Sequence, residues 1–147
     1  MTIRESDIQI EACKLFAEAA EAQEEGRLIA AEALYRVAAE LGYPLAMNNL
    51  AILLEDVMQP SRPDEAVYWL KRAVHGGYEG AAWNLAMRQR QTGRRRWYIH
   101  WLRIAASLGS EDAGPALATA TTRDDTWWAL EGVDPPPFVK GAAAWPA

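Results

Sequence analysis

The sequence predicts an all-α fold of stacked helix-turn-helix repeats. One observation is internal self-similarity, because residues 35–51, 70–86 and 102–118 align in register without gaps. The second is composition, since alanine is abundant and β-branched residues are sparse, which favours helices. The third is a glycine that closes the apolar periodicity of each copy, where a helix would end.

The three copies share small residues at fixed positions. The second copy follows the first by 35 residues, and the third follows the second by 32. The shared alanines let neighbouring helices approach closely, and the shared leucines fill the layers between them. One unit alone cannot bury such a face, so neighbouring units must stack. The matched sets are Ala38, Ala73 and Ala105; Gly42, Gly77 and Gly109; Tyr43 and Tyr78; Ala46, Ala81 and Ala113; Leu50, Leu85 and Leu117; and Ala51, Ala86 and Ala118.

Length and composition bound the remaining possibilities. A chain of 147 residues fits one domain, which buries roughly 68–70% of its unfolded surface. Cys13 is the sole cysteine, which excludes an internal disulfide framework and fits a reducing compartment. The acidic opening stretch is unlike a secretory signal, and no later run reaches membrane-spanning length. We therefore expect a cytoplasmic protein with no membrane partner.

Apolar spacing places the helices in order. We expect them over about residues 5–25, 27–41, 45–56, 63–76, 79–91, 94–108 and 111–121. Gly42 suits the left-handed residue that follows a helix. Pro63 suits a first helical position. The loop of residues 57–63 contains two prolines, which prevent a continuous helix between residues 56 and 63. Asp124 is placed to begin a last short helix through Trp127 and Trp128.

A recurring pattern carries a resemblance to a known family. The pattern is Ala-x-x-x-Leu-Ala, a variable loop, Ala-x-x-Trp-Leu/Tyr-x-x-Ala-x-x-x-Gly, then Tyr and again Ala-x-x-x-Leu-Ala. It resembles the Sel-like repeats, relatives of the tetratricopeptide repeats, over residues 27–121. The opening helix pair, with Gly26, Ala31, Tyr35 and Ala38, is more similar to a plain tetratricopeptide unit. The chain departs from the pattern in three respects: one alanine replaces a glycine, the third period is short, and Pro115 falls inside the last copy.

The resemblance implies a right-handed α-α superhelix, or α-solenoid, of about three to four repeats. We expect a single repeat domain over residues 1–131 and a proline-rich tail over residues 132–147. The first helix and the Trp127-Trp128 segment are expected to cap its two ends. The expected repeat units are residues 5–42, 43–77, 78–109 and 110–131.

A solenoid of this kind binds partners on its concave face, which the first helix of each repeat lines. Projecting that geometry gives a candidate binding surface of six residues, to which Phe16 could add. Large side chains at helical spacing, such as Trp83 and Met87, are more often core residues than binding residues. Trp69 and Trp101 occupy equivalent repeat positions, as do Asn49 and Asn84, and all four are expected to be structural. The candidate surface is Asn48, Ile52, Glu55, Trp83, Met87 and Arg90.

A basic cluster spans residues 88–96, although the net charge is −5. In one interpretation its arginines form a solvated turn whose stems cover neighbouring tryptophans. In the other, Arg90, Arg94, Arg95 and Trp97 anchor an acidic protein partner, because arginine and tryptophan dominate binding hot spots. A nucleic-acid role would use the same residues together with stacking by Tyr98. The acidic total argues against that role.

The sequence gives little support for catalysis. Neither His75 nor His100 has a carboxylate or hydroxyl at a spacing that implies a triad or a metal site. We therefore expect no enzyme activity and no cofactor or metal. The function we predict is a protein-binding module, either an adaptor or an inhibitor. The alternative is an immunity-type protein of bacterial kind that occludes the active site of a toxin or effector. Phe138 and Trp145 suggest that the tail docks on the last repeat or on a partner.

Overall fold

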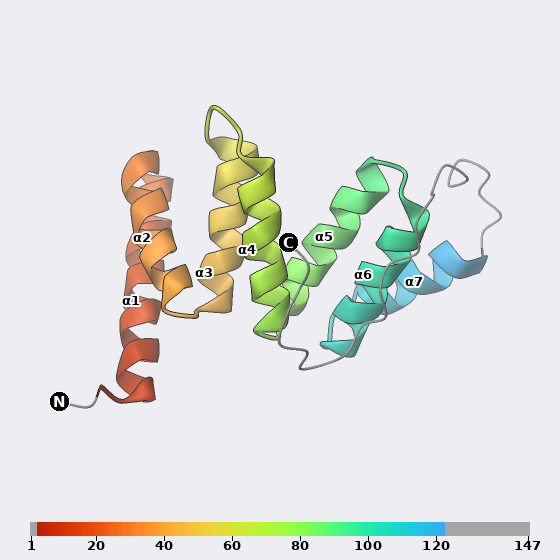
Figure 1. Ribbon diagram of the computed structural model, residues 1–147, viewed down its shortest axis with the longest axis horizontal. Helices are drawn as coiled ribbons and strands as arrows, with labels where there is room; N and C mark the ends of the chain where they lie inside the picture. Colours follow the sequence, from red (N-terminus) through yellow and green to blue (C-terminus); the bar gives the residue numbers. More distant parts are fainter. Residues whose placement is uncertain (1–2, 123–147) are drawn as a thin grey trace. The chain divides into compact units, whose positions relative to one another are not determined.

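The structure is a computed structural model that describes residues 3–122, and these form an all-α fold (Figure 1). Residues 123–147 lie outside the described part, and with them the expected last helix from Asp124, the Trp127-Trp128 cap and the tail with Phe138 and Trp145. The chain divides into two compact units between Gly76 and Gly77. The sequence analysis placed a boundary between repeat units one residue later, after residue 77.

The first unit, which we call unit 1, holds four α-helices and one π-helical turn. The second, unit 2, holds three α-helices in its described residues. Each helix packs against the next within its unit, because the connections are only a few residues long. The elements of unit 1 are α1 (Glu5–Glu24), α2 (Leu28–Glu40), α3 (Pro44–Ile52), η1 (Leu53–Val57) and α4 (Pro63–His75). Those of unit 2 are α5 (Glu79–Gln91), α6 (Arg95–Ser107) and α7 (Ala113–Thr122).

Alanine dominates the helix contacts of both units. Almost every repeated alanine is buried, and the matched Leu50 and Leu85 are each at most 1% exposed. A methyl side chain lets two helix axes approach to about 8 Å, and the leucines then fill the space between layers. Leu117 and Ala118 depart from this pattern, since Leu117 is half-buried and Ala118 is exposed. They lie on α7, the last helix of the described residues.

The first helix pair is held by alanines and by an aromatic cluster. Ala12, Ala19 and Ala22 form the buried face of α1. The ring of Phe16 lies 5.8 Å from that of Tyr35 and meets the ring of Tyr43 edge-on at 5.3 Å. Phe16 therefore contributes to packing between the first three helices.

The third helix ends differently from the expected continuous helix to residue 56. Regular α-helix stops at Ile52, and a π-helical turn follows. The amide of Met58 donates to the carbonyl of Leu53 at 2.9 Å, which closes the wider turn. Leu53 and Leu54 are both fully buried. The wider turn therefore places two consecutive leucines in the core before the loop leaves the helix.

Several sequence expectations about helix ends are confirmed. Gly42 has φ +93 and follows Leu41, the C-cap residue of α2. Pro63 begins α4, with Asp64 and Glu65 in its first turn. Pro115 lies in the first turn of α7, where its missing amide hydrogen costs no helical hydrogen bond.

Within residues 3–122, no helix combines the length and the apolar character needed to cross a membrane.

The packing of α3 predicts a large difference between two neighbouring aliphatic side chains. Leu50→Ala removes a fully buried side chain and should lower the free energy of unfolding by about 2–5 kcal/mol. Ile52 is 37% exposed on the same helix, so Ile52→Ala should cost less than about 1 kcal/mol. Urea unfolding followed by circular dichroism measures both. Similar losses in the two variants would contradict the observed burial.

Candidate functional site

A stripe of three large side chains runs along α5 in unit 2. Trp83, Met87 and Arg90 follow one another at the i, i+4 and i+7 spacing that shares one helix face. Trp83 and Met87 are half-buried and Arg90 is exposed, whereas Leu85 and Ala86 are buried. The stripe therefore lies at the edge of the core and keeps part of its surface accessible. We call these three residues the α5 stripe.

The end of α5 fixes the backbone beside the stripe. The amide of Arg94 donates to the carbonyl of Gln89 at 3.0 Å, and that of Gly93 donates to the carbonyl of Arg90 at 3.1 Å. This pair of bonds is the Schellman arrangement, which needs a left-handed residue, and Gly93 supplies it with φ +71. Arg94 is exposed directly after this turn. The turn therefore presents Arg94 next to the α5 stripe.

Arg95 belongs to the packing of α6 on α7. Its Nη2 donates to the carbonyl of Ala120 at 2.9 Å, and its Nε is buried without a hydrogen-bond partner among the described residues. A guanidinium held in this way is less available as an anchor for a partner than Arg90 or Arg94. For Arg95, the structure favours packing over binding.

An aromatic cluster on α6 surrounds His100. The ring of Trp97 meets that of His100 edge-on at 5.5 Å, and the ring of Trp101 does so at 5.0 Å. Burial of the imidazole, with Arg103 nearby, lowers the pKa of His100 to about 4. The imidazole is therefore neutral at physiological pH. Trp97 is half-buried at the edge of this cluster.

The three candidate residues of unit 1 differ in accessibility. Asn48 is only 5% exposed, and its amide donates weakly to the side chain of Asn49 at 3.4 Å. The sequence analysis placed Asn48 on an accessible binding surface, and the structure corrects this. A partner cannot reach a buried amide. Ile52 is 37% exposed and Glu55 is half-buried. Whether these two contact a partner stays a prediction.

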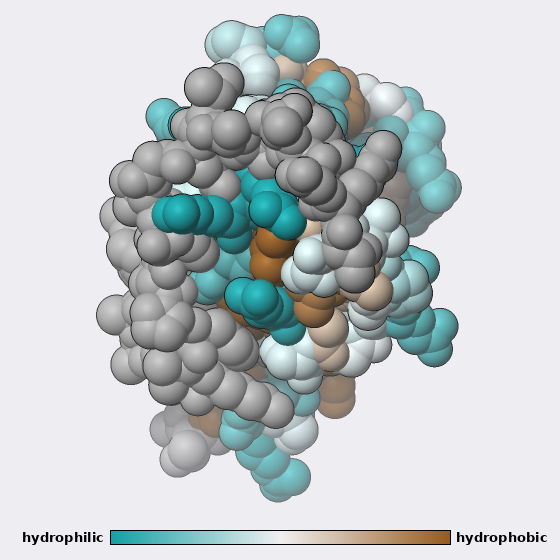
Figure 2. Space-filling model, turned by 90° about the vertical axis from the view of Figure 1, so that its right-hand side faces the viewer, coloured by the Kyte–Doolittle hydropathy of each residue, from teal (hydrophilic) through white to brown (hydrophobic). Residues whose placement is uncertain are grey.

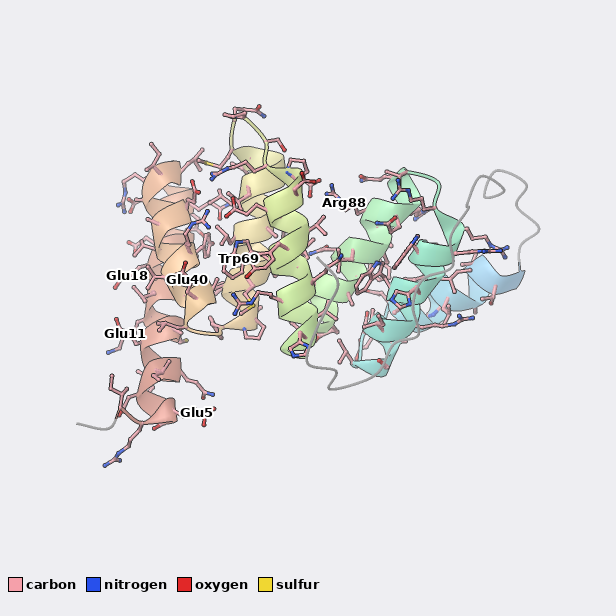
Figure 3. The ribbon with its side chains drawn as sticks, viewed as in Figure 1. Glu5, Glu11, Glu18, Glu40, Trp69 and Arg88 are labelled. Carbon is pink, nitrogen blue, oxygen red and sulfur yellow. The ribbon has the colours of Figure 1, made fainter. Side chains whose placement is uncertain are left out.

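Trp69 and Trp101 are buried, as expected for structural residues. They are 4% and 3% exposed, respectively. The guanidinium of Arg72 lies 5.1 Å from the ring centre of Trp69, where a cation–π contact is favourable. Figure 3 shows Trp69 on α4 and Arg88, a member of the basic cluster, on α5.

A cluster of four charges in unit 1 was not predicted from the sequence. Arg36 donates to both Glu32 and Glu65, and Arg62 donates to Glu32 at 2.7 Å. The hydrogen bond from Arg36 is the main cause that lowers the pKa of Glu65. The i, i+4 spacing of Glu32 and Arg36 was a visible signal, but their partners lie about 30 residues away in the chain. The cluster ties α2 to the start of α4.

The described residues offer no constellation suited to metal binding. Over residues 3–122, no group of three or more histidine, cysteine, aspartate or glutamate side chains could hold a metal ion.

The surface on view in Figure 2 places hydrophilic side chains directly beside hydrophobic ones. Such mixed surface suits contacts that combine apolar and charged groups.

The comparisons with known proteins give one partial match. A segment of this chain is 46% identical over 54 residues to an F-box protein of Arabidopsis thaliana. The segment is 37% of this chain, and the chain spans only 15% of the plant protein. No protein-family model matches the chain. No solved structure matches it either.

The environment of His100 predicts a loss of stability in mild acid. The unfolded imidazole takes up a proton near pH 6.5, whereas the folded one does so only near pH 4. Between these values the proton favours the unfolded state, so stability falls as the pH falls. The wild-type protein should lose roughly 1–3 kcal/mol more between pH 7 and about pH 4.5 than His100→Gln. Urea unfolding at both pH values measures this, and equal losses would contradict it.

Proposed function

We propose that this protein is a non-enzymatic protein-binding module built as a right-handed α-solenoid of Sel-like repeats. One observation supports the repeat architecture in this proposal. All of the repeated alanines except Ala118 are buried at equivalent positions in the two units, as repeated helix contacts require. A cytoplasmic protein without a membrane partner or cofactor fits this role.

The α5 stripe is the observation that carries the binding proposal. It combines a partly accessible tryptophan and methionine with an exposed arginine, and Arg94 adds a second exposed cation beside it. Tryptophan and arginine are the residues most enriched at binding hot spots, and methionine adapts its shape to a partner. The partner we propose presents an apolar side chain next to carboxylates. Trp97 is a further candidate contact, and Arg95 is mainly a packing residue.

Two forms of this function remain, and stoichiometry separates them. An inhibitor of a toxin or effector, the immunity-type reading, would form a tight one-to-one complex. An adaptor would bind several partners more weakly. Nucleic-acid binding through residues 88–96 is a weaker proposal, because the chain carries a net charge of −5 and Arg95 is engaged with α7.

Truncating single side chains of the α5 stripe should weaken partner binding. The full chain, immobilised on a solid support, is first incubated with an extract of its native cell to capture a partner. The captured partner is then identified and purified, and its binding to the chain is measured by titration calorimetry. Trp83→Ala and Arg90→Ala should each raise the Kd by about tenfold or more, because each removes a hot-spot side chain. The titration also gives the stoichiometry that separates an inhibitor from an adaptor.

Arg103→Ala provides the matched control, because Arg103 is an exposed arginine of unit 2 outside the stripe. It should leave the Kd within about twofold. If all three variants bind like the wild-type protein, the α5 stripe is not the binding surface. A gel-shift experiment with DNA and RNA at low salt tests the nucleic-acid alternative, and we expect no complex.

A further inference from the structure

Positive charge gathers where α5 ends, and no carboxylate lies near it in the sequence. Residues 80–110 contain six arginines and no aspartate or glutamate. Arg90 and Arg94 are exposed, and neither forms an ion pair with another described residue. The end of α5 therefore carries positive charge that the described residues do not balance. The three carboxylates in the described part of unit 2 lie at or just before the starts of α5 and α7: Glu79, Glu111 and Asp112.

The described part of the chain ends beside these arginines. The carbonyl of Ala120, near the end of α7, accepts the hydrogen bond from Nη2 of Arg95 at 2.9 Å, and Arg95 directly follows Arg94. Helix α6 packs against both α5 and α7 (Figure 1). Each further residue extends a chain by at most about 3.3–3.6 Å, so the residues after 122 can reach Arg94 within a few positions.

The sequence that follows carries groups complementary to the α5 stripe. Residues 124–134, which we call the acidic segment, hold four carboxylates and no basic residue. Asp124 and Asp125 come first, and Trp127 and Trp128 follow directly after one threonine. Carboxylates next to large apolar rings are the chemistry that an arginine beside a tryptophan and a methionine suits.

The order of the groups in the acidic segment matches their order along α5. Read from the end of α5 backwards, the helix presents Arg90, then Met87 and then Trp83, over about 10 Å. A segment that leaves α7 and runs antiparallel to α5 meets the arginines with its carboxylates and the two apolar side chains with its tryptophans. The opposite direction would place the tryptophans at the arginines and the carboxylates at Trp83.

We propose that the acidic segment binds the α5 stripe of its own chain, where it competes with the protein partner. This inference rests on the proposed function, because it uses the same side chains. It also names the chemistry of the partner, which must present carboxylates followed by large apolar side chains in order to displace the segment. Because the segment is tethered within reach of the stripe, its effective concentration is high and a weak contact is enough.

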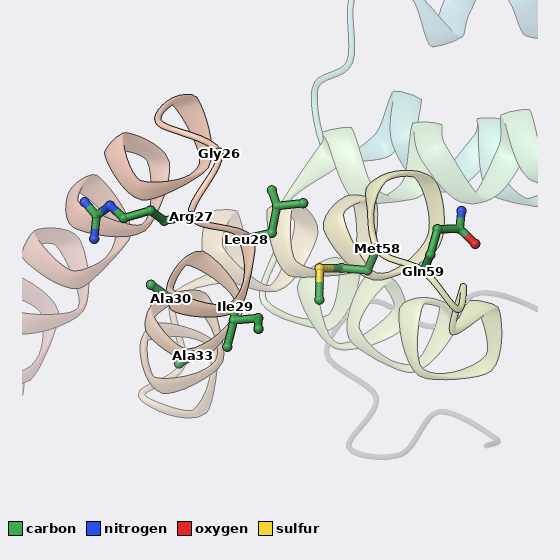
Figure 4. A pocket seen from close by; sticks show the side chains of 8 residues that line it. All are labelled: Gly26, Arg27, Leu28, Ile29, Ala30, Ala33, Met58 and Gln59. Atoms are coloured by element: carbon green, nitrogen blue, oxygen red, sulfur yellow. The ribbon is translucent and has the colours of Figure 1, made fainter.

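The hollow in unit 1 does not offer the same match. Its volume is about 830 Å³, and Ile29 and Ala33 of α2 line it together with Met58, which follows η1 (Figure 4). Arg27 is the one cation among its lining residues, and it already pairs with Glu25 at 2.7 Å. An acidic segment would gain little there, because its carboxylates would compete with Glu25 for a single arginine.

Disulfide exchange within the full chain tests the contact without a partner. In a Cys13→Ser background, Gln91→Cys places a thiol at the exposed end of α5, one residue after Arg90. Thr126→Cys places the second thiol between the carboxylates and the tryptophans of the acidic segment. Equilibration with glutathione gives the effective concentration of the two thiols for each other.

Two double substitutions remove the two halves of the proposed contact. Asp124→Asn with Asp125→Asn removes the charges, and Trp127→Ala with Trp128→Ala removes the rings. Each should lower the effective concentration of the Gln91→Cys and Thr126→Cys pair by about fivefold or more. If either double substitution leaves this value unchanged, the proposal is overturned, because the contact requires both the charges and the rings.

Ser107→Cys with Thr126→Cys provides the control pair. Ser107 is exposed at the other end of α6, twelve residues after Arg95, so it lies away from the α5 stripe. The effective concentration of this pair should change by less than about twofold in both tail variants. A fall of equal size in both pairs would also overturn the proposal, since it would reflect a general change in the tail.

Partner titration measures the competition. Asp124→Asn with Asp125→Asn should lower the Kd of the captured partner by about threefold, because the segment no longer occupies the stripe. In that background Trp83→Ala should raise the Kd by about thirtyfold, which is more than in the wild-type chain, where the same substitution also releases the segment. Glu111→Gln with Asp112→Asn removes two exposed carboxylates outside the segment and should leave the Kd within about twofold.

The tail contact and the proposed function fail in different ways. If Trp83→Ala weakens partner binding but neither tail variant changes the crosslinking, the tail contact is overturned and the proposed function stands. If the crosslinking responds as expected but Trp83→Ala leaves partner binding unchanged in both backgrounds, the tail contact is supported and the proposed binding surface is overturned.

Discussion

The close approach of helices through alanine is the contact on which the structure of each unit depends. Buried alanines line both partners of the contact, so the helix axes come close and the layers are filled by few large side chains, such as Leu50 and Leu85. Such contacts tolerate little change in volume, because a larger residue would push the two backbones apart. The spacing of the helices is therefore set by the smallest side chains in the sequence.

Thin helix layers leave many large side chains at or near the surface. Trp83 and Met87 are partly accessible on α5, and Ile29 and Val37 stand out on α2. The α5 stripe ends in an exposed arginine, which suits a partner with carboxylates.

Charged residues have distinct roles in the two units. In unit 1, Arg36 and Arg62 bridge two helices through Glu32 and Glu65, although partial exposure limits what each pair contributes to about 1 kcal/mol or less. In unit 2, Arg95 is bound to a backbone carbonyl of α7. Arginines that look equivalent in the sequence are thus divided by their neighbours into packing residues and accessible ones.

The sequence by itself determined the helices, their glycine ends and the buried alanine positions other than Ala118, because these depend on local spacing and on backbone conformation. Gly42 and Pro63 stand where they were expected for that reason. The burial of Asn48 and the engagement of Arg95 were decided only by the tertiary structure. So were the π-helical turn and the four-charge cluster. Each of these depends on which distant helix a side chain meets, and helical spacing in one segment carries no information about that neighbour.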